Sequence, residues 1–227
     1  MKKLVSGCGA VTLALILTIC SSFTAFASCP INSSTSESAS AEAREYYNLL
    51  PQGVKDMFET KGWKIEISDL VAVNYYGSIY GGFSLEGYIA GYTDSEAKEI
   101  VLADTDTGAA LNHEMGHFFD YNVGMVSASQ EFAKIFKAEV SSFDKGNNTY
   151  SYTDASEFFA EAFREYVECA GYLKKTCPQT YAFIDDLVAD YGGTTTLGVK
   201  EYTRCKSHTA EAITREAAGI LNKLFGG

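Results

Sequence analysis

Residues 107–124 read TGAALNHEMGHFFDYNVG, and this stretch decides the fold. The pattern predicts an α-helix that begins at Thr107 or Gly108 and ends near Gly124, with Asn122 in its last turn. Apolar side chains flank the HEMGH run in its middle: Leu111, Met115, Phe118 and Phe119. An ordinary buried helix could carry this run by chance, but with three histidines in the chain we expect such an accident in well under about one chain in a hundred.

The HEMGH run, residues 113–117, has the spacing of a zinc site. Positions i and i+4 of an α-helix stack on one face, so His113 and His117 can present two imidazoles to one zinc ion. Glu114 lies about 100° around the helix from His113. Its carboxylate therefore points beside the metal, where it can take a proton from a water that the metal activates. We expect one zinc ion per chain with Glu114 as the general base, and Gly116 allows a neighbouring backbone to pack closely.

A hydrolytic zinc site needs a third protein ligand and one open position. A third histidine six residues after His117 would be one solution, but Val123 occupies that position and Asp120 replaces the glycine expected before it. The other histidine of the chain is His208. The remaining choice is a carboxylate on a second helix, and residues 156–163, SEFFAEAF, provide two.

Glu157 and Glu161 are the two carboxylates of that apolar segment. Spaced i and i+4, they share one helix face, so one can bind the metal while the other orients a ligating histidine. The alternative is a solvated acidic stripe that continues through Glu165 and Glu168. A solvated helix face is seldom so apolar around its carboxylates, which favours the metal site.

The rest of the chain predicts an α+β domain, with strands before helices. Pro51 breaks a helix over residues 41–62, and Trp63 to Ile67 alternates as a strand does. Residues 71–103 contain short apolar runs separated by turn residues, which predicts the strands of a short mixed sheet. Further helices are expected over residues 128–143, 179–191 and 209–224. Another helix begins at a cap, Asp154, and runs to about Ala170, with Glu157 at capping-box spacing.

Residues 1–27 have the layout of a signal peptide, with two lysines, a long apolar run and a final Ala-Phe-Ala. An uncleaved membrane anchor is the alternative, but Thr, Ser and Cys interrupt the apolar run and a cleavage site follows. We expect a secreted, extracellular protein without a membrane span in the mature chain. Residues 26–29 loosely resemble a lipobox, which would instead attach a lipid at Cys29. Residues 28–40 are Ser-rich and predict a flexible leader, and one domain follows over residues 41–227.

The mature chain is strongly acidic. The formal charge of the full chain is −11, and removing Lys2 and Lys3 with the signal makes it −13. Nucleic acids and anionic lipid surfaces are therefore poor partners, whereas a substrate with basic segments is attracted. The sequence leaves the oligomeric state open.

Four cysteines remain in an oxidising compartment: Cys29, Cys169, Cys177 and Cys205. They allow three connectivities. Cys169 and Cys177 bracket a predicted turn and are good candidates for a pair, with Cys205 as the rival partner. None has the C-x-x-C spacing of a zinc cluster, so we interpret them as disulfides or free thiols and not as ligands.

The order of motifs resembles one family. HEMGH is followed forty residues later by EFFAEAF and then by CPQTYAFI, which is similar to the catalytic domain of anthrax toxin lethal factor and to the secreted Pro-Pro endopeptidases. The resemblance covers roughly residues 63–191. It implies a small zincin-type metallopeptidase domain with a short mixed sheet, the HExxH helix and a mostly helical C-terminal half. It also implies that Glu157 is the third zinc ligand beside His113 and His117, and that Tyr150 donates a hydrogen bond to the oxyanion, with Tyr152 as competitor.

The resemblance implies a secreted zinc-dependent endopeptidase that acts on protein or peptide substrates. We expect the substrate to lie extended along an edge strand within residues 88–103. The Trp-containing loop of the Pro-Pro endopeptidases has no counterpart in residues 76–92, YGSIYGGFSLEGYIAGY, so the sequence leaves proline-directed cleavage open. The tail after Gly192 has no counterpart either. Two alternatives are a non-catalytic secreted binding protein or adhesin on the same scaffold, and a toxin that acts on host targets.

Overall fold

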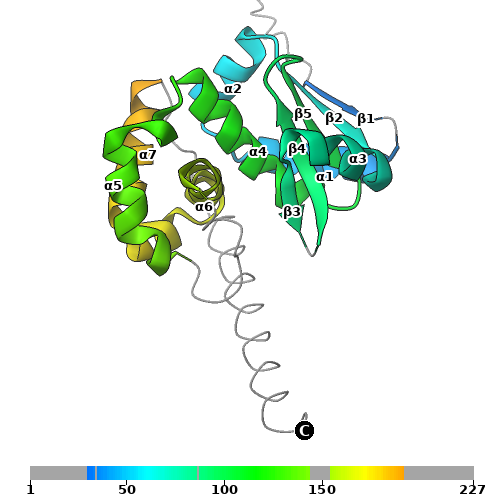
Figure 1. Ribbon diagram of the computed structural model, residues 1–227. Helices are drawn as coiled ribbons and strands as arrows, with labels where there is room; N and C mark the ends of the chain where they lie inside the picture. Colours follow the sequence, from blue (N-terminus) through cyan, green and yellow to red (C-terminus); the bar gives the residue numbers. More distant parts are fainter. Residues whose placement is uncertain (1–29, 34, 86, 144–153, 192–227) are drawn as a thin grey trace, which may run out of the picture.

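The chain folds into a five-stranded sheet, a central helix and a cluster of helices. The computed structural model describes residues 30–33, 35–85, 87–143 and 154–191. Figure 1 shows the sheet on one side of helix α4 (Thr107–Asn122) and, on its other side, helices α5 (Gln130–Glu139), α6 (Ala155–Thr176) and α7 (Pro178–Asp190). The expected α+β class, with a short mixed sheet and a mostly helical C-terminal half, is confirmed. The predicted signal peptide and the predicted helix over residues 209–224 lie outside the described residues.

The sheet has the strand order β1-β2-β5-β4-β3. The strands are β1 (Ile31–Ser33), β2 (Lys64–Ser68), β3 (Phe83–Leu85), β4 (Tyr88–Asp94) and β5 (Glu99–Ala103). β1, β2 and β5 run parallel, while β4 pairs antiparallel with β5 and with β3. The expected substrate strand within residues 88–103 is therefore not an edge. Because β3 pairs with β4 and covers it, β3 is the outermost strand on this side among the described residues.

Residues 31–40 differ from the expected flexible leader. β1 adds to the sheet by pairing in parallel with β2, and Ile31 at its start is buried. Ser36 then caps the next helix, α1 (Glu37–Tyr47), by accepting a hydrogen bond from the backbone N–H of Ala39 at 3.3 Å. A short strand needs main-chain hydrogen bonds more than apolar side chains, and serine is a strong helix cap. The Ser-rich composition was therefore a misleading signal for disorder.

Helices α1 and α2 (Gln52–Thr60) confirm the predicted break at Pro51. Their apolar side chains enter the main core, where Phe58 packs against Trp63 and Phe118 with ring centroids 6.1 and 4.8 Å apart. Because Phe118 belongs to α4, this aromatic cluster fixes one end of the central helix against the N-terminal elements.

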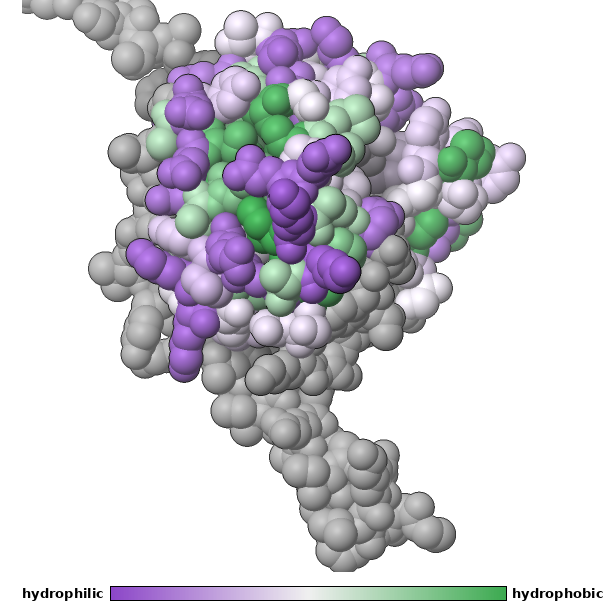
Figure 2. Space-filling model, turned by 60° about the vertical axis from the view of Figure 1, so that its left-hand side comes forward, coloured by the Kyte–Doolittle hydropathy of each residue, from purple (hydrophilic) through white to green (hydrophobic). Residues whose placement is uncertain are grey.

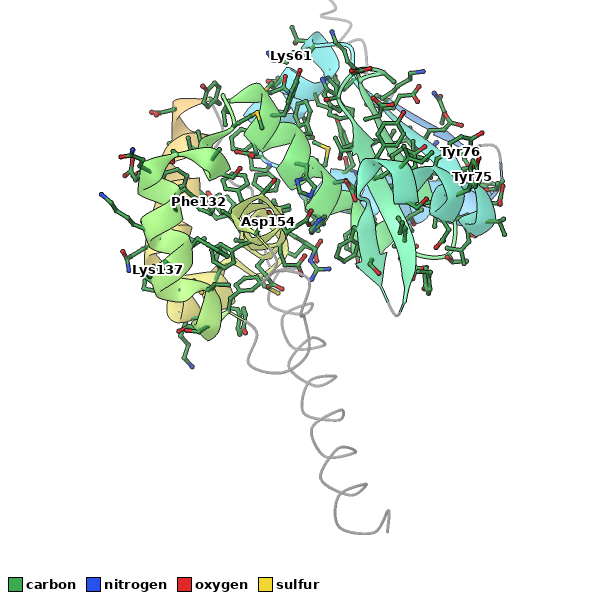
Figure 3. All side chains as sticks on the ribbon, in the orientation of Figure 1. Lys61, Tyr75, Tyr76, Phe132, Lys137 and Asp154 are labelled. Atoms are coloured by element: carbon green, nitrogen blue, oxygen red, sulfur yellow. The ribbon has the colours of Figure 1, made fainter. Side chains whose placement is uncertain are left out.

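Helix α3 (Leu70–Tyr80) replaces a predicted strand. Asp69 caps its first turn by accepting a hydrogen bond from Ala72 N at 3.0 Å, and Gly81 ends it in the left-handed region at φ 74°. Large apolar side chains on its outer face are exposed: Val71, Tyr75, Tyr76, Ile79 and Tyr80. Figure 3 shows Tyr75 and Tyr76 pointing away from the sheet. The strand prediction was wrong because it assumed that these β-branched and aromatic residues pack within a sheet.

The two faces of the sheet pack against different helices. Val73 of α3 shares a small core with Val101 and Ala103 of β5. The intervening β5 residues, Ile100 and Leu102, belong to the main core with α4. This alternation is the period of two expected of a strand that is covered on both faces.

Helices α4 and α6 approach each other closely at the HEMGH run. A Cβ atom at Gly116 would lie 2.6 Å from Ala160 Cα and 2.9 Å from Ala160 O. The glycine therefore allows the close packing that the sequence predicted, and it brings the side chains of α6 within reach of the histidines on α4.

The cysteines differ from the favoured pairing. Helix α6 continues past Ala170 to Thr176, with a kink at Cys169, instead of forming a turn. Cys169 is disulfide-bonded, whereas Cys177 is a buried free thiol whose pKa burial raises to about 11. The expected Cys169–Cys177 pair is therefore wrong, and the partner of Cys169 lies outside the described residues.

Phenylalanine side chains fill the space between the C-terminal helices. Phe132 of α5 lies with its ring centroid 5.3 Å from Phe159 of α6 and 5.1 Å from Phe183 of α7. The single-turn helices η1 (Val126–Ala128) and η2 (Val140–Ser142) flank α5. On the outer surface of this side, hydrophilic and hydrophobic residues are mixed (Figure 2). Within the described part of the chain, no helix is long and apolar enough to cross a membrane.

Candidate metal centre

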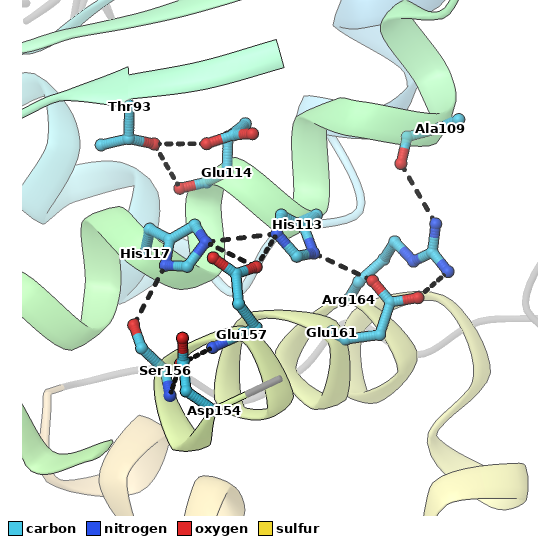
Figure 4. A network of polar contacts seen from close by, with 10 residues as sticks. All are labelled: Thr93, Ala109, His113, Glu114, His117, Asp154, Ser156, Glu157, Glu161 and Arg164. Atoms are coloured by element: carbon cyan, nitrogen blue, oxygen red, sulfur yellow. Dashed lines mark hydrogen bonds and ion pairs between the residues drawn. The ribbon is translucent and has the colours of Figure 1, made fainter. Parts of the chain in front are cut away.

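Helix α4 carries His113, Glu114 and His117 (Figure 4). His113 is fully buried, Glu114 is 1% exposed and the His117 side chain is 20% exposed. Phe83 of β3 packs on the imidazole of His113, with ring centroids 4.3 Å apart. The two histidines thus lie at the boundary between the core and the surface, with their ring planes held by packing.

Helix α6 supplies the opposite side of the site. Asp154 caps it as predicted, because its carboxylate accepts hydrogen bonds from the N–H groups of Ser156 at 2.8 Å and Glu157 at 3.0 Å. The capping-box spacing of Glu157 has a different use. Its carboxylate extends toward the histidines of α4 (Figure 4).

Three ligand atoms converge between the two helices. His113 Nε2 and His117 Nε2 are 3.2 Å apart, and Glu157 Oε2 lies 3.2 Å from the first and 3.5 Å from the second. Within the described part of the chain, this buried carboxylate oxygen makes no well-formed hydrogen bond. Tetrahedral zinc ligands about 2.0–2.2 Å from the metal are about 3.3–3.6 Å from each other. The separations and the donor types therefore fit a tetrahedral zinc ion with one position left over.

The charges of the site perturb the pKa values of two of these residues. Burial by itself lowers the pKa of His113, but Glu157, Glu161 and Glu114 outweigh it and raise that pKa to about 9. Burial by itself raises the pKa of Glu157, but the two histidines outweigh it and lower that pKa to about 2. The carboxylates around His113 therefore favour positive charge in the site, whether as a proton on His113 or as a metal cation.

A second layer of polar contacts supports His113. Glu161, 2% exposed, has its Oε2 atom 2.9 Å from His113 Nδ1. Its other oxygen accepts a hydrogen bond from Arg164, whose second terminal nitrogen donates to the backbone oxygen of Ala109 at 3.2 Å. On the other histidine, Ser156 Oγ lies 3.4 Å from His117 Nδ1. A carboxylate at Nδ1 favours the tautomer whose Nε2 can bind a metal.

The acidic residues of α6 do not form the solvated stripe of the alternative interpretation. Glu161 and Glu168 are both buried, and Glu168 accepts a hydrogen bond from Asn112 of α4 at 2.9 Å. Glu157 also faces α4. Three of the four carboxylates therefore serve the contact between the two helices.

A cleft of about 270 Å³ opens beside the converging atoms. Its lining includes Glu114, His117 and Glu157, the Gly81-Gly82-Phe83 segment that enters β3, and the aromatic rings of Tyr80 and Tyr121. Thr93 of β4 lies in the same lining and donates a hydrogen bond from Oγ1 to Glu114 Oε2 at 2.7 Å. A molecule that enters this cleft would meet the carboxylate of Glu114 and the side chains of His117 and Glu157 together.

The sequence missed Thr93, Phe83 and Arg164 as members of the site. Arg164 had a usable signal, because it lies three residues after Glu161 and seven after Glu157, and therefore on the same helix face. Thr93 and Phe83 had none, because their positions depend on the strand order. Tyr150, Tyr152 and His208 lie outside the described residues.

Comparison with known proteins identifies related sequences around this site. Residues 91–187 match the family described as anthrax toxin lethal factor, N- and C-terminal domain. The chain is 39% identical over 79 residues to a Pro-Pro endopeptidase of Clostridioides difficile (strain 630), which covers 33% of this chain and 35% of that protein. It is 35% identical over 115 residues to lethal factor of Bacillus anthracis, which covers 41% of this chain and 14% of that protein.

A solved structure shares the fold. The structure of a Pro-Pro endopeptidase from Paenibacillus alvei superimposes with a TM-score of 0.56 and 22% sequence identity, over 69% of this chain and 96% of that one. The matched segments span about a third of the Clostridioides difficile relative and a seventh of lethal factor. Family and fold agree with the resemblance in the motifs.

Proposed function

We propose that the chain is a zinc-dependent endopeptidase. Residues 91–187 match the family of anthrax toxin lethal factor, which supports this proposal. The convergence of His113 Nε2, His117 Nε2 and Glu157 Oε2 beside the carboxylate of Glu114 carries the proposal. The name of the Clostridioides difficile relative, Pro-Pro endopeptidase, supports the hydrolysis of peptide bonds.

In this proposal His113, His117 and Glu157 hold the zinc ion, and the fourth position stays open to the cleft. Bound there, zinc would polarise the scissile carbonyl and lower the pKa of water. Glu114 takes the proton of the attacking water and passes it to the leaving amine. Glu161 orients His113 through Nδ1, so that Nε2 stays available to the metal.

Tyr150 is proposed to stabilise the oxyanion, with Tyr152 as its competitor. The resemblance of the EFFAEAF region supports this role, because that family has a tyrosine seven residues before its ligand glutamate. Replacing Tyr150 by Phe would then lower kcat and leave the zinc content unchanged, whereas the same effect from Tyr152→Phe would move the role to Tyr152.

The proposed substrate is an extended segment of a protein or peptide outside the cell. β3 is the outermost described strand beside the cleft, and an extended chain can add to the edge of a sheet. Secretion rests on the signal-peptide layout of residues 1–27. Cleavage between prolines, which the name of the Clostridioides difficile relative states for that enzyme, is one possible outcome of a substrate profile.

The test starts with the zinc content of the mature protein, measured by elemental analysis for wild type, Glu157→Ala and Glu161→Ala. We expect one zinc per wild-type chain, loss in Glu157→Ala and retention with weaker binding in Glu161→Ala. If Glu161→Ala is the variant that loses zinc, the ligand assignment is wrong.

Peptide hydrolysis is tested separately with Glu114→Gln, which removes the base and no ligand. A proteome-derived peptide mixture analysed by mass spectrometry should show cleavage by wild type and none by Glu114→Gln, although both contain zinc. A wild-type protein that holds zinc and cleaves nothing would instead support the non-catalytic binding protein.

A further inference from the structure

The two carboxylate oxygens of Glu114 have different surroundings. Oε2 accepts the hydrogen bond from Thr93 Oγ1 at 2.7 Å, and the same hydroxyl lies 3.3 Å from the Glu114 backbone oxygen. Oε1 is buried and has no hydrogen-bond partner among the described residues. An unpartnered buried oxygen is unfavourable unless something occupies the space beside it during function. Thr93 thus determines that Oε2 is hydrogen-bonded and that Oε1 is left without a hydrogen bond to the described residues.

The pairing of β4 with β5 places Thr93 on the face of the sheet that meets α4, and a bulge in β4 comes just before this paired segment. One step along β3 corresponds to two steps along β4, from Gly91 to Ile89, so Ala90 is an extra residue in the ladder. Ala90 packs in the main core, and the next residue, Gly91, also faces α4. Tyr92 then faces α3, and Thr93 faces α4 again. Thr93 pairs with Ile100, which lies in the main core with α4, whereas Tyr92 pairs with Val101, which packs on the α3 side.

Gly91 leaves room for the side chain of Glu114. A Cβ atom at Gly91 would lie 3.2 Å from Glu114 Cγ and 3.1 Å from Leu102 Cδ2, so a side chain here would press on the stem of Glu114. β4 therefore offers a glycine beneath the methylene groups of Glu114 and, two residues later, a hydroxyl at its carboxylate.

We propose that Thr93 is a positioning residue for Glu114: it holds Oε2 so that Oε1 stays unpaired and oriented to accept the proton of the attacking water. This inference rests on the proposed endopeptidase function and deepens it. Thr93 acts through Glu114 and does not touch the reacting atoms. Its removal should therefore lower kcat and leave KM and zinc binding unchanged, because substrate and metal contacts stay in place.

The test compares Thr93→Val, which keeps the shape and removes the hydroxyl, with Thr93→Ser, which keeps the hydroxyl. Thr176→Val is the matched control, because it also removes one threonine hydrogen bond. Thr176 is the last residue of α6, far along this helix from Glu157. With the peptide that wild type cleaves fastest, we expect kcat to fall about 10- to 100-fold in Thr93→Val, with KM within about twofold. Thr93→Ser should stay within about threefold of wild type, and all variants should hold one zinc and melt within a few degrees of wild type.

A double-mutant cycle shows whether Thr93 acts through Glu114. In the Glu114→Asp background, whose carboxylate is one methylene too short to meet the Thr93 hydroxyl in the same way, adding Thr93→Val should lower the remaining turnover much less than it does in wild type. Full kcat in Thr93→Val, equal loss in the Ser and Val variants, or additive losses in the cycle would each overturn the positioning role. A wild type without zinc or hydrolysis would overturn the endopeptidase function and this inference together, so the two failures are distinguishable.

Discussion

At the scale of single residues, Arg164 connects both helices of the site. One terminal nitrogen binds Glu161 and the other the backbone of Ala109 at 3.2 Å. A lysine keeps the charge but cannot make both contacts with one fixed geometry. We expect Arg164→Lys to weaken zinc binding about tenfold, because Glu161 would hold His113 less firmly. Chelator competition measures the change, with Arg44→Lys on the exposed side of α1 as control. Equal zinc affinities in wild type and Arg164→Lys would show that Arg164 does not support the metal site.

The pKa values of His113 and Glu157 predict how the metal-free protein responds to pH. The pKa of His113 is raised from 6.5 to about 9, so its contribution to stability is complete below pH 6.5 and is lost as pH rises through 9. The pKa of Glu157 is lowered from 4.5 to about 2, so its contribution is complete above pH 4.5 and is lost as pH falls through 2. In chelator, the melting temperature should therefore fall between pH 6.5 and 9. His113→Gln should flatten this decline, and an unchanged decline would assign it to other groups.

At the scale of elements, the approach of α4 to α6 depends on Gly116. A methyl group here would lie 2.6 Å from Ala160 Cα, so the two helices would have to separate. We expect Gly116→Ala to destabilise the protein by about 1–3 kcal/mol in spite of the better helix propensity of alanine. Zinc content should fall as well, because the ligands come from both helices. Gly171→Ala is the matched control, since an added Cβ there has no contact within 4 Å with the described residues outside its own helix turn. If both variants melt alike, the close approach does not limit stability.

How much of these elements could be predicted follows from where their apolar residues lie. The sequence predicted the elements that bury their apolar residues with regular spacing. These are the helices over residues 107–122 and 178–190 and the strands β2, β4 and β5. Helix α3 exposes five large apolar side chains, so the same rules predicted a strand. Its end signals, Asp69 and Gly81, were present but were outweighed by composition.

The site divides in the same way. His113, Glu114 and His117 are four or fewer residues apart on one helix, so local geometry was enough to group them. Glu157 and Glu161 needed a second helix, and their apolar surroundings supplied that signal. Thr93 reaches Glu114 through the pairing of β4 with β5 and the packing of the sheet on α4, and no local pattern in the sequence shows either.

At the scale of the whole molecule, α4 lies between the sheet and the C-terminal helices, and the proposed metal site joins the two sides. His113 and His117 come from the helix that packs on the sheet, and Glu157 comes from the first helix of the other side. Zinc bound there would stabilise the folded chain by about 2.7 kcal/mol at a free concentration one hundred times its dissociation constant. We therefore expect a chelator to lower the melting temperature by several degrees and added zinc to restore it.

Scanning calorimetry of wild type and Glu157→Ala tests this connection between metal and fold. Glu157→Ala should melt at nearly the same temperature with and without chelator, because it lacks the ligand that α6 contributes. If chelator instead lowers the melting temperatures of both proteins equally, the ion that it removes binds elsewhere. A wild type that loses zinc without any change in melting temperature would mean that packing around Gly116 and Ala160 already holds the two sides together, and that the metal serves the chemistry alone.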